Sequence, residues 1–192
     1  MNFTRSAIED VIICEPVVHG DDRGYFSEVY RLDLLNDFLG YSVHFCQDNE
    51  SMSKKGVLRG LHYQLPPFAQ TKLVRVIQGA ILDVAVDIRK GSATFGQHVA
   101  VELSSSNKRQ LLVPRGFAHG FLVLADDTKV AYKVDHYYSA NHDRGLLYND
   151  SALQIDWGVA SDAVELSEKD KQHPKLAETE DLFDYNQDYY AN

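Results

Sequence analysis

The sequence has few cysteines and no long hydrophobic run. It contains two cysteines, Cys14 and Cys46, with no second cysteine near either, so a disulfide framework and CxxC redox chemistry are excluded and both are expected to be packed free thiols. The most apolar windows, such as 116–125, fall far short of a membrane span. Glu9 and Asp10 stand where a secretory signal needs apolar residues, so we expect a cytoplasmic protein.

Basic charge is also scarce. The chain has 19 Lys and Arg against 28 Asp and Glu, which gives a formal net charge of −9. An acidic surface repels the phosphate backbone, so binding to nucleic acid is not expected, and any anionic small ligand needs a local cluster of Lys and Arg. The remaining composition is that of an ordinary globular protein, and the 192 residues suit one domain, predicted to span 1–192.

Helix signals are few, and most of the chain is predicted to be strand. An apolar stripe over 32–40 ends at Gly40, and Ser167 is a candidate N-cap for a second short helix. Elsewhere the segments 11–19, 24–31, 44–53 and 72–89 alternate or are rich in β-branched residues. Turn residues interrupt them about every ten residues, as in sandwiches and barrels. Gln78–Gly79 predicts a hairpin-type turn.

Two faces are predicted for the strand that follows Gly79. Ile81, Asp83, Ala85 and Asp87 share one face, and the apolar residues between them share the other. The tail beyond about residue 176 is acidic and aromatic, and it is expected to be a peripheral strap or a frayed end.

Polar residues concentrate in two segments that resemble the two signature motifs of the cupin superfamily. The segment 58–79 contains Arg59, His62, Gln64 and Lys72, and the segment 113–121 contains His119. Cupin metals are held by imidazole and carboxylate, whereas two of the four ligand positions here are Gln64 and Lys72. A protonated lysine has no lone pair and repels a cation. A metal-free barrel is therefore predicted, unless Asp83 or another residue completes a site.

Several long blocks in the same order resemble the dTDP-4-dehydrorhamnose 3,5-epimerase family over residues from about 10 to 175. The blocks are 21–30, 47–64, 70–89, 92–96, 113–121, the strand around Tyr132, and 166–170. The resemblance implies an all-β fold, a cupin-type antiparallel β-barrel (jelly roll) with a few short helices. It also implies a homodimer that exchanges an N-terminal strand, and catalysis without a cofactor or a metal.

The resemblance also implies roles for individual residues. His62 matches the base, Asp170 its paired carboxylate, Tyr132 the acid and Lys72 the cation near the keto oxygen. Tyr138 matches a tyrosine that stacks on thymine, and Asp143 stands where the family often has a longer glutamate, so its reach is an open question. The remaining positions that match contacts to the dTDP-sugar are Arg23, Glu28, Gln47, Asn49, Arg59, His119 and Lys169.

The residue types suit that chemistry by themselves. Inverting a carbon beside a ketone requires a base near neutral pKa, which histidine provides, and a carboxylate behind it, for which Asp170 and Asp83 are both candidates. A cation such as Lys72 stabilises the enolate, and a neutral tyrosine can return the proton from the other face.

The expected reaction is epimerisation of dTDP-4-dehydro-6-deoxy-D-glucose at C3 and C5, giving dTDP-4-dehydro-L-rhamnose. Three alternatives stay open on sequence alone. They are an epimerase that inverts one centre, a metal-dependent cupin such as a dioxygenase, and a sugar-nucleotide binder without catalysis.

Overall fold

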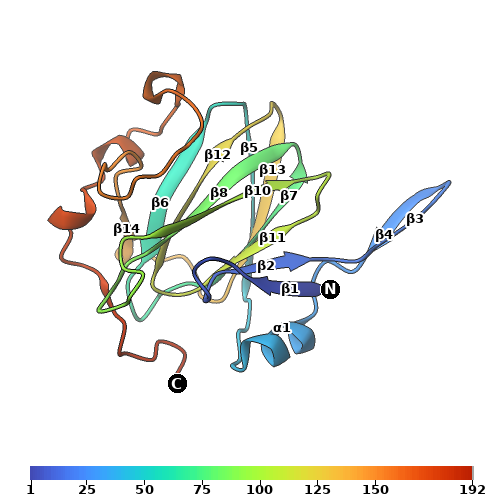
Figure 1. Ribbon diagram of the computed structural model, residues 1–192, viewed down its shortest axis with the longest axis horizontal. Helices are drawn as coiled ribbons and strands as arrows, with labels where there is room; N and C mark the ends of the chain where they lie inside the picture. The colour runs from blue at the N-terminus through green and yellow to red at the C-terminus, as the bar shows by residue number, and fades with distance from the viewer. Residues whose placement is uncertain (192) are drawn as a thin grey trace.

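Two antiparallel sheets face each other in the computed structural model, which describes residues 1–191 (Figure 1). The six-stranded sheet has the order β1-β2-β11-β7-β13-β5, and the five-stranded sheet has the order β10-β8-β12-β6-β14. The first sheet consists of β1 (Asn2–Arg5), β2 (Ile12–Glu15), β11 (Gln110–Val113), β7 (Lys72–Gln78), β13 (Thr128–Val134) and β5 (Gln47–Ser53). The second consists of β10 (His98–Ser104), β8 (Ala80–Asp87), β12 (Phe117–Val123), β6 (Leu58–Gln64) and β14 (Asp143–Gly145). The predicted all-β jelly-roll fold is confirmed, as a sandwich whose sheets do not close into a barrel.

Strand β8 has apolar contacts on both of its faces, as its sequence predicts. Ile81 and Ala85 belong to the core between the two sheets, together with Val74 and Val130 from the facing sheet. The alternate residues of β8 belong to a second core on the outer face of the five-stranded sheet. The segment 146–183 covers this second core with Leu146, Tyr148, Leu153, Trp157, Leu176 and Phe183.

The turn at Gly79 does not form a hairpin, so this prediction is wrong. Strand β7 pairs with β11 and β13, and β8 pairs with β10 and β12, so the chain crosses here from one sheet to the other. Gly79 has φ +80°, and a Cβ on it would lie 2.2 Å from Oγ1 of Thr128. Glycine is therefore required both by backbone conformation and by close packing.

The strand predicted over 11–19 is divided into two. It splits into β2 and β3 (Val18–Asp21), with Pro16 between them, because proline has no N–H to donate to a sheet. β3 pairs only with β4 (Gly24–Ser27), which takes up the first half of the strand predicted over 24–31. This hairpin extends away from the sandwich as an arm (Figure 1).

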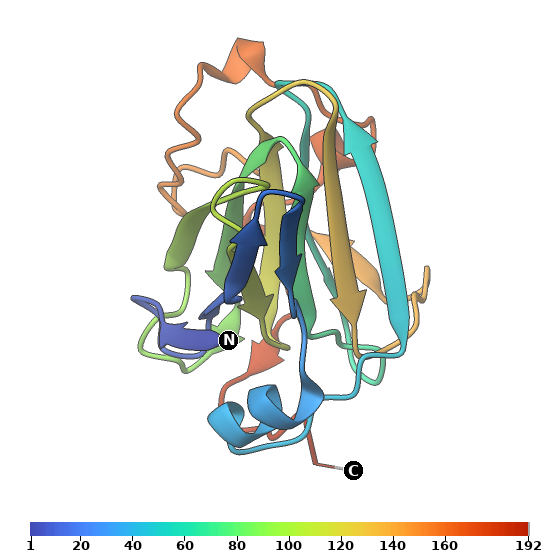
Figure 2. The same ribbon diagram turned by 90° about the vertical axis from the view of Figure 1, so that its right-hand side faces the viewer.

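The helices are short. The predicted helix over 32–40 is confirmed as α1 (Leu32–Leu39), which ends at Gly40 in the left-handed conformation, and it lies at one end of the sandwich (Figure 2). Three 3₁₀ turns follow: η1 (Ser161–Ala163), η2 (Asp170–Gln172) and η3 (Leu176–Glu178). The N-cap position of η2 is held by Lys169, not by Ser167, but the Oγ of Ser167 accepts a hydrogen bond from the Asp170 N–H at 3.1 Å. No helix within residues 1–191 is long and apolar enough to cross a membrane.

The tail is a strap packed on the sandwich. β15 (Phe183–Asp184) pairs in parallel with β9 (Arg89–Lys90), and Phe183 is 2% exposed. Further along, the Tyr190 hydroxyl lies 2.7 Å from Oγ1 of Thr71 and accepts a hydrogen bond from the Arg115 N–H.

Both cysteines are free thiols. Cys14 is buried as expected, and burial raises its pKa to about 12. Cys46 is exposed, so the expectation of a packed thiol is wrong there. The sequence around Cys46 alternates, and this residue lies just before β5, outside the core between the sheets.

Candidate active site

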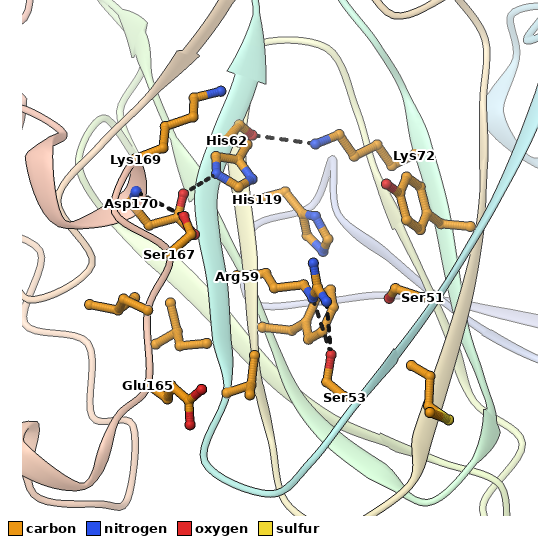
Figure 3. A pocket seen from close by; sticks show the side chains of 16 residues that line it. Ser51, Ser53, Arg59, His62, Lys72, His119, Glu165, Ser167, Lys169 and Asp170 are labelled. Atoms are coloured by element: carbon orange, nitrogen blue, oxygen red, sulfur yellow. Dashed lines mark hydrogen bonds and ion pairs between the residues drawn. The ribbon is translucent and has the colours of Figure 1, made fainter.

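A cavity of about 530 Å³ opens between the two sheets (Figure 3). Strands β6 and β12 form one wall, strands β5, β7 and β13 the other, and the segment 165–170 borders the opening. The cavity gathers seven of the residues that the sequence predicts: Arg59, His62, Lys72, His119, Tyr132, Lys169 and Asp170.

His62 and Asp170 form a closely coupled pair. Nε2 of His62 lies 2.6 Å from Oδ1 of Asp170, and the other ring nitrogen faces the cavity (Figure 3). Burial raises the pKa of Asp170, but the imidazoles of His173 and His62 beside it outweigh burial and hold that pKa below its usual range. The carboxylate therefore accepts a hydrogen bond from the Nε2–H of His62, which leaves Nδ1 as the nitrogen with a free lone pair.

The pKa of the base suits work at neutral pH. Burial lowers the pKa of His62 from its usual 6.5, and the neighbouring Asp170 opposes that shift only in part. The imidazole is therefore neutral at pH 7 and able to accept a proton.

Lys72 places a cation close to His62. It begins β7, and its Nζ donates to the backbone oxygen of His62 at 3.4 Å. Burial lowers the pKa of Lys72 to about 8, so the ammonium is still mostly charged at neutral pH. A charge held inside the sandwich stabilises a developing oxyanion more strongly than one in water does.

Tyr132 lies on the wall opposite His62. It belongs to β13 of the six-stranded sheet, whereas His62 belongs to β6 of the five-stranded sheet. Burial raises the pKa of Tyr132, so the phenol keeps its proton at pH 7. An unprotonated imidazole nitrogen and a protonated phenol therefore face the same space from two sides.

Two further polar groups line the cavity. Nε2 of His119 lies 2.7 Å from Oδ1 of Asp83, so Asp83 pairs with His119. Of the two carboxylates that the sequence offers as partners for His62, it is therefore Asp170 that contacts His62. Arg59 donates twice to Oγ of Ser53, at 3.0 and 3.2 Å.

A smaller compartment of about 170 Å³ adjoins the first and shares His62, Lys72 and Tyr132 with it. Asp143 accepts a hydrogen bond from the Tyr138 hydroxyl at 3.1 Å and forms an ion pair with Lys169, so the shorter carboxylate does reach its neighbours. The compartment contains four more of the predicted binding residues: Gln47, Asn49, Tyr138 and Asp143.

Arg23 and Glu28 do not join the site within this chain. The Arg23 side chain is 90% exposed at the end of the hairpin arm and pairs with Asp21. Glu28 follows the arm and lies 3.9 Å from Arg31.

Some residues near the site escape sequence reasoning. The amide of Gln64 bonds to backbone groups of Phe68, Tyr137 and Ser139, so this residue at a cupin ligand position holds a loop in place. His173, beside Asp170, was not predicted. Its spacing of three residues from Asp170 is the signal that could have revealed it.

The sandwich and its cavity together define a class of protein. The two cupin motif segments do not carry a full set of metal ligands, because Lys72 and Gln64 stand at two of the ligand positions. Instead, an imidazole–carboxylate pair, an ammonium and a phenol surround one space. The molecule is a cupin-like jelly-roll enzyme built for proton transfer.

The comparisons with known proteins identify the family. The model of the dTDP-4-dehydrorhamnose 3,5-epimerase family matches residues 5–178, and the chain belongs to this family. It is 52% identical over 172 residues to dTDP-4-dehydrorhamnose 3,5-epimerase of Escherichia coli K12, which covers 90% of this chain and 92% of that protein.

Solved structures agree with the fold. The dTDP-6-deoxy-D-glucose-3,5-epimerase of Legionella pneumophila Philadelphia 1, in complex with dTDP-4-keto-L-rhamnose, is 45% identical with a TM-score of 0.92, and the match covers 97% of this chain and 99% of that chain. A 3′-monoepimerase from Streptomyces bikiniensis, in complex with dTDP-quinovose, is 33% identical with a TM-score of 0.83, covering 90% and 86%.

Proposed function

We propose that this protein inverts C3 and C5 of dTDP-4-dehydro-6-deoxy-D-glucose to give dTDP-4-dehydro-L-rhamnose. The observation that carries the proposal is the placement of His62 and Tyr132 on opposite walls of one cavity, with Lys72 beside it. Inversion at carbon requires that a proton leave one face of the sugar and return on the other. An E. coli relative at 52% identity carries the name of this activity.

The reaction begins at His62. Its Nδ1 accepts the proton from a carbon next to the C4 ketone, and the electron pair of the broken C–H bond moves into the new C=C bond while the carbonyl oxygen becomes an enolate oxygen. Asp170 stabilises the imidazolium through the Nε2 proton. Lys72 holds the charge on the enolate oxygen.

Tyr132 completes the inversion. It gives its hydroxyl proton to the carbon from the opposite face, the electron pair of the enolate forms the new C–H bond, and the ketone is restored. His62 releases the proton it took to solvent, and the phenolate of Tyr132 regains a proton from solvent. The same residues then act on the second carbon after the sugar ring adjusts.

The nucleotide part of the substrate needs cations and an aromatic surface. Arg59 in the cavity can bind a diphosphate oxygen pair, and Lys169 adds positive charge at the opening. The exposed ring of Tyr138 offers a stacking surface for thymine. His119, Gln47, Asn49 and Asp143 supply hydrogen-bonding groups around the sugar.

We further propose that the active form is a homodimer in which the hairpin arm of one chain completes the cavity of the other. The arm carries Arg23, and Glu28 follows it, yet both lie outside the cavity of their own chain. Its Tyr25 and Phe26 are 62% and 70% exposed. Exposed aromatic residues on a projecting hairpin are typical of a surface that binds a partner.

Residues 1–192 are proposed to act as one cytoplasmic domain that needs no cofactor. The side chains at the cupin ligand positions support the absence of a metal cofactor, since the ammonium of Lys72 replaces a metal ligand in the first motif segment. We expect the full rate to survive exhaustive treatment with a chelator, measured as product formed per chain. Activity that returns only with added zinc, iron or manganese would contradict the proposal and favour a metal-dependent cupin.

Deuterium exchange tests the reaction. The protein is incubated with dTDP-4-dehydro-6-deoxy-D-glucose in deuterated water, and NMR shows which carbons exchange and which invert. Exchange and inversion at both C3 and C5 are expected. Inversion at one carbon would identify a single-centre epimerase, and binding without exchange would identify a sugar-nucleotide binder. The His62→Asn variant serves as the control, because it keeps the ring's approximate shape without a base.

A further inference from the structure

Three potential metal ligands converge behind the base. Oδ1 of Asp170 lies 2.6 Å from Nε2 of His62 and 3.4 Å from Nε2 of His173. Within the described residues, 1–191, this is the one group of three His, Cys, Asp or Glu side chains whose ligand atoms all lie within 4.8 Å of one another. It does not coincide with the cupin motif positions, because Gln64, Lys72 and His119 take no part in it.

His173 is held in place by packing, and one of its nitrogens is unused. Its side chain is 9% exposed, and the buried Nε2 has no hydrogen-bond partner. The ring lies against Gly145, where a Cβ would come within 2.4 Å of that nitrogen, and it stands edge-on to His62 at 5.5 Å between ring centroids. Burying a polar atom without a hydrogen-bond partner is unfavourable, so this nitrogen, 3.4 Å from Oδ1 of Asp170, points to a missing ligand.

We propose that His62, Asp170 and His173 form a reversible inhibitory site for Zn²⁺. Two imidazole nitrogens and one carboxylate oxygen are a common ligand set for this ion, and a water molecule can take the fourth tetrahedral position. The ion inserts between the three side chains, which part to the wider spacing that coordination requires. Mg²⁺ does not compete, because it prefers an octahedral shell of oxygen ligands.

The ion can reach this site from two sides. His62 and Asp170 line the cavity between the sheets, and His173 lines a separate surface depression of about 710 Å³ on the outer side of β14 and η2. Asp143, which pairs with Lys169, lines both this depression and the smaller compartment that adjoins the cavity.

Zinc at this site prevents His62 from acting as a base, although the ion binds Nε2 and not the cavity-facing Nδ1. In the neutral imidazole of His62 the proton is on Nε2, where it bonds to Asp170. Coordination requires the Nε2 lone pair, so the proton moves to Nδ1. Nδ1 then carries a proton and can no longer accept one from the sugar, with no net release of protons. This consequence rests on the proposed function, whereas binding of the ion does not.

Binding is tested first, without an activity readout. Full-length protein treated with chelator is titrated with Co²⁺, which reports its geometry by visible absorption, and Zn²⁺ is then used to displace it. One tetrahedral ion per chain is expected. His173→Gln should weaken binding by at least the ~10–100-fold that losing even an outer partner of a metal site costs. His44→Gln is the matched control, because His44 is exposed outside the cluster and should bind as the wild type does.

Inhibition is tested second, with each variant compared with its own chelator-treated rate. At about 10 µM free Zn²⁺ a site with a dissociation constant of about 1 µM leaves roughly one tenth of the rate, and chelator restores it. His173→Gln should keep most of its own rate in zinc. Melting curves of all variants without metal show whether they are folded.

The outcomes separate the two proposals. Octahedral Co²⁺ in the wild type, or equal affinity in His173→Gln, overturns the site. Tetrahedral binding without loss of rate overturns its inhibitory role. If the chain does not turn over the sugar nucleotide, the proposed function fails, and the cobalt spectrum and the His173→Gln titration still decide whether the site exists.

Discussion

In the proposed reaction four side chains share the proton transfer, and the surroundings of each one determine whether it is charged. His62 is neutral near pH 7 because burial lowers its pKa below 6.5, whereas Lys72 stays mostly charged because burial lowers its pKa only to about 8. Burial raises the pKa of Tyr132 and keeps it protonated. Asp170 remains ionised. Each group is therefore in the protonation state that its proposed step requires.

Tyr132→Phe separates the two half-reactions. The base still removes the proton and Lys72 still holds the enolate, but the opposite face lacks its acid. In deuterated water the substrate should take up deuterium with retained configuration, while inverted product falls by about 10²-fold or more, the usual weight of a general acid. The measurement is NMR of substrate and product over time.

The fold should tolerate this change. The phenyl ring keeps its packing, so stability should fall by no more than about 1 kcal/mol, the net value of one hydrogen bond. Inversion at the wild-type rate would show that another group, such as Tyr138 or a water molecule, is the acid. Loss of exchange together with inversion would place Tyr132 in the deprotonation step.

The pH dependence should be bell-shaped. His62 must be neutral, so kcat/KM rises with pH through a pKa below 6.5, and Lys72 must be charged, so kcat/KM falls again above about 8. In Lys72→Arg the guanidinium stays protonated, and the alkaline fall should move upward. An unchanged alkaline limb in that variant would assign it to a different group.

At the scale of elements, the hairpin arm is tested by complementation between chains. Arg23→Ala removes a cation from the arm, and His62→Asn removes the base from the cavity. Each variant alone should lose most of its activity, by about 10-fold or more for the arginine, whose charged hydrogen bonds to diphosphate are lost. Refolding the two together should restore about a quarter of the wild-type rate, because half of the dimers are mixed and each has one intact site.

Two controls accompany this mixture. Each variant is refolded by itself under the same conditions, and a mixture of Arg23→Ala with His62→Asn is assayed before refolding, when the chains have not exchanged. Activity that stays at the average of the two separate variants would show that the arm does not complete a neighbouring cavity.

The sequence pattern predicts features well where they depend on a single helix or strand. The two faces of β8 follow from alternation, and the end of α1 follows from Gly40. The pairing of strands depends on the rest of the chain. The turn residues at Gly79 therefore predict that the chain changes direction, but they do not show that β7 and β8 belong to different sheets. The spacing of His173 from Asp170 is only a weak signal, because their contact depends on the 3₁₀ turn η2 and on the packing of the His173 ring against Gly145.

At the scale of the whole molecule, the tail is part of the folded core. Phe183→Ala should lower the free energy of unfolding by about 3–5 kcal/mol, the usual cost of removing a buried phenylalanine ring, measured by denaturant titration. Tyr185→Ala is the matched control in the same strap, since Tyr185 is 51% exposed and a surface change costs about 1 kcal/mol or less. Equal losses in the two variants would mean that the strap is not packed as described.

The strap also has a consequence for the order in which the chain is made. Tyr190 bonds to Thr71 across 119 residues of sequence, and β15 pairs with β9, so both partners are synthesised long before their contacts. On the ribosome, Thr71 and Arg89 stay without these contacts until residues 183–190 have emerged. The emergence of this strap is therefore the event that allows that end of the nascent sandwich to close.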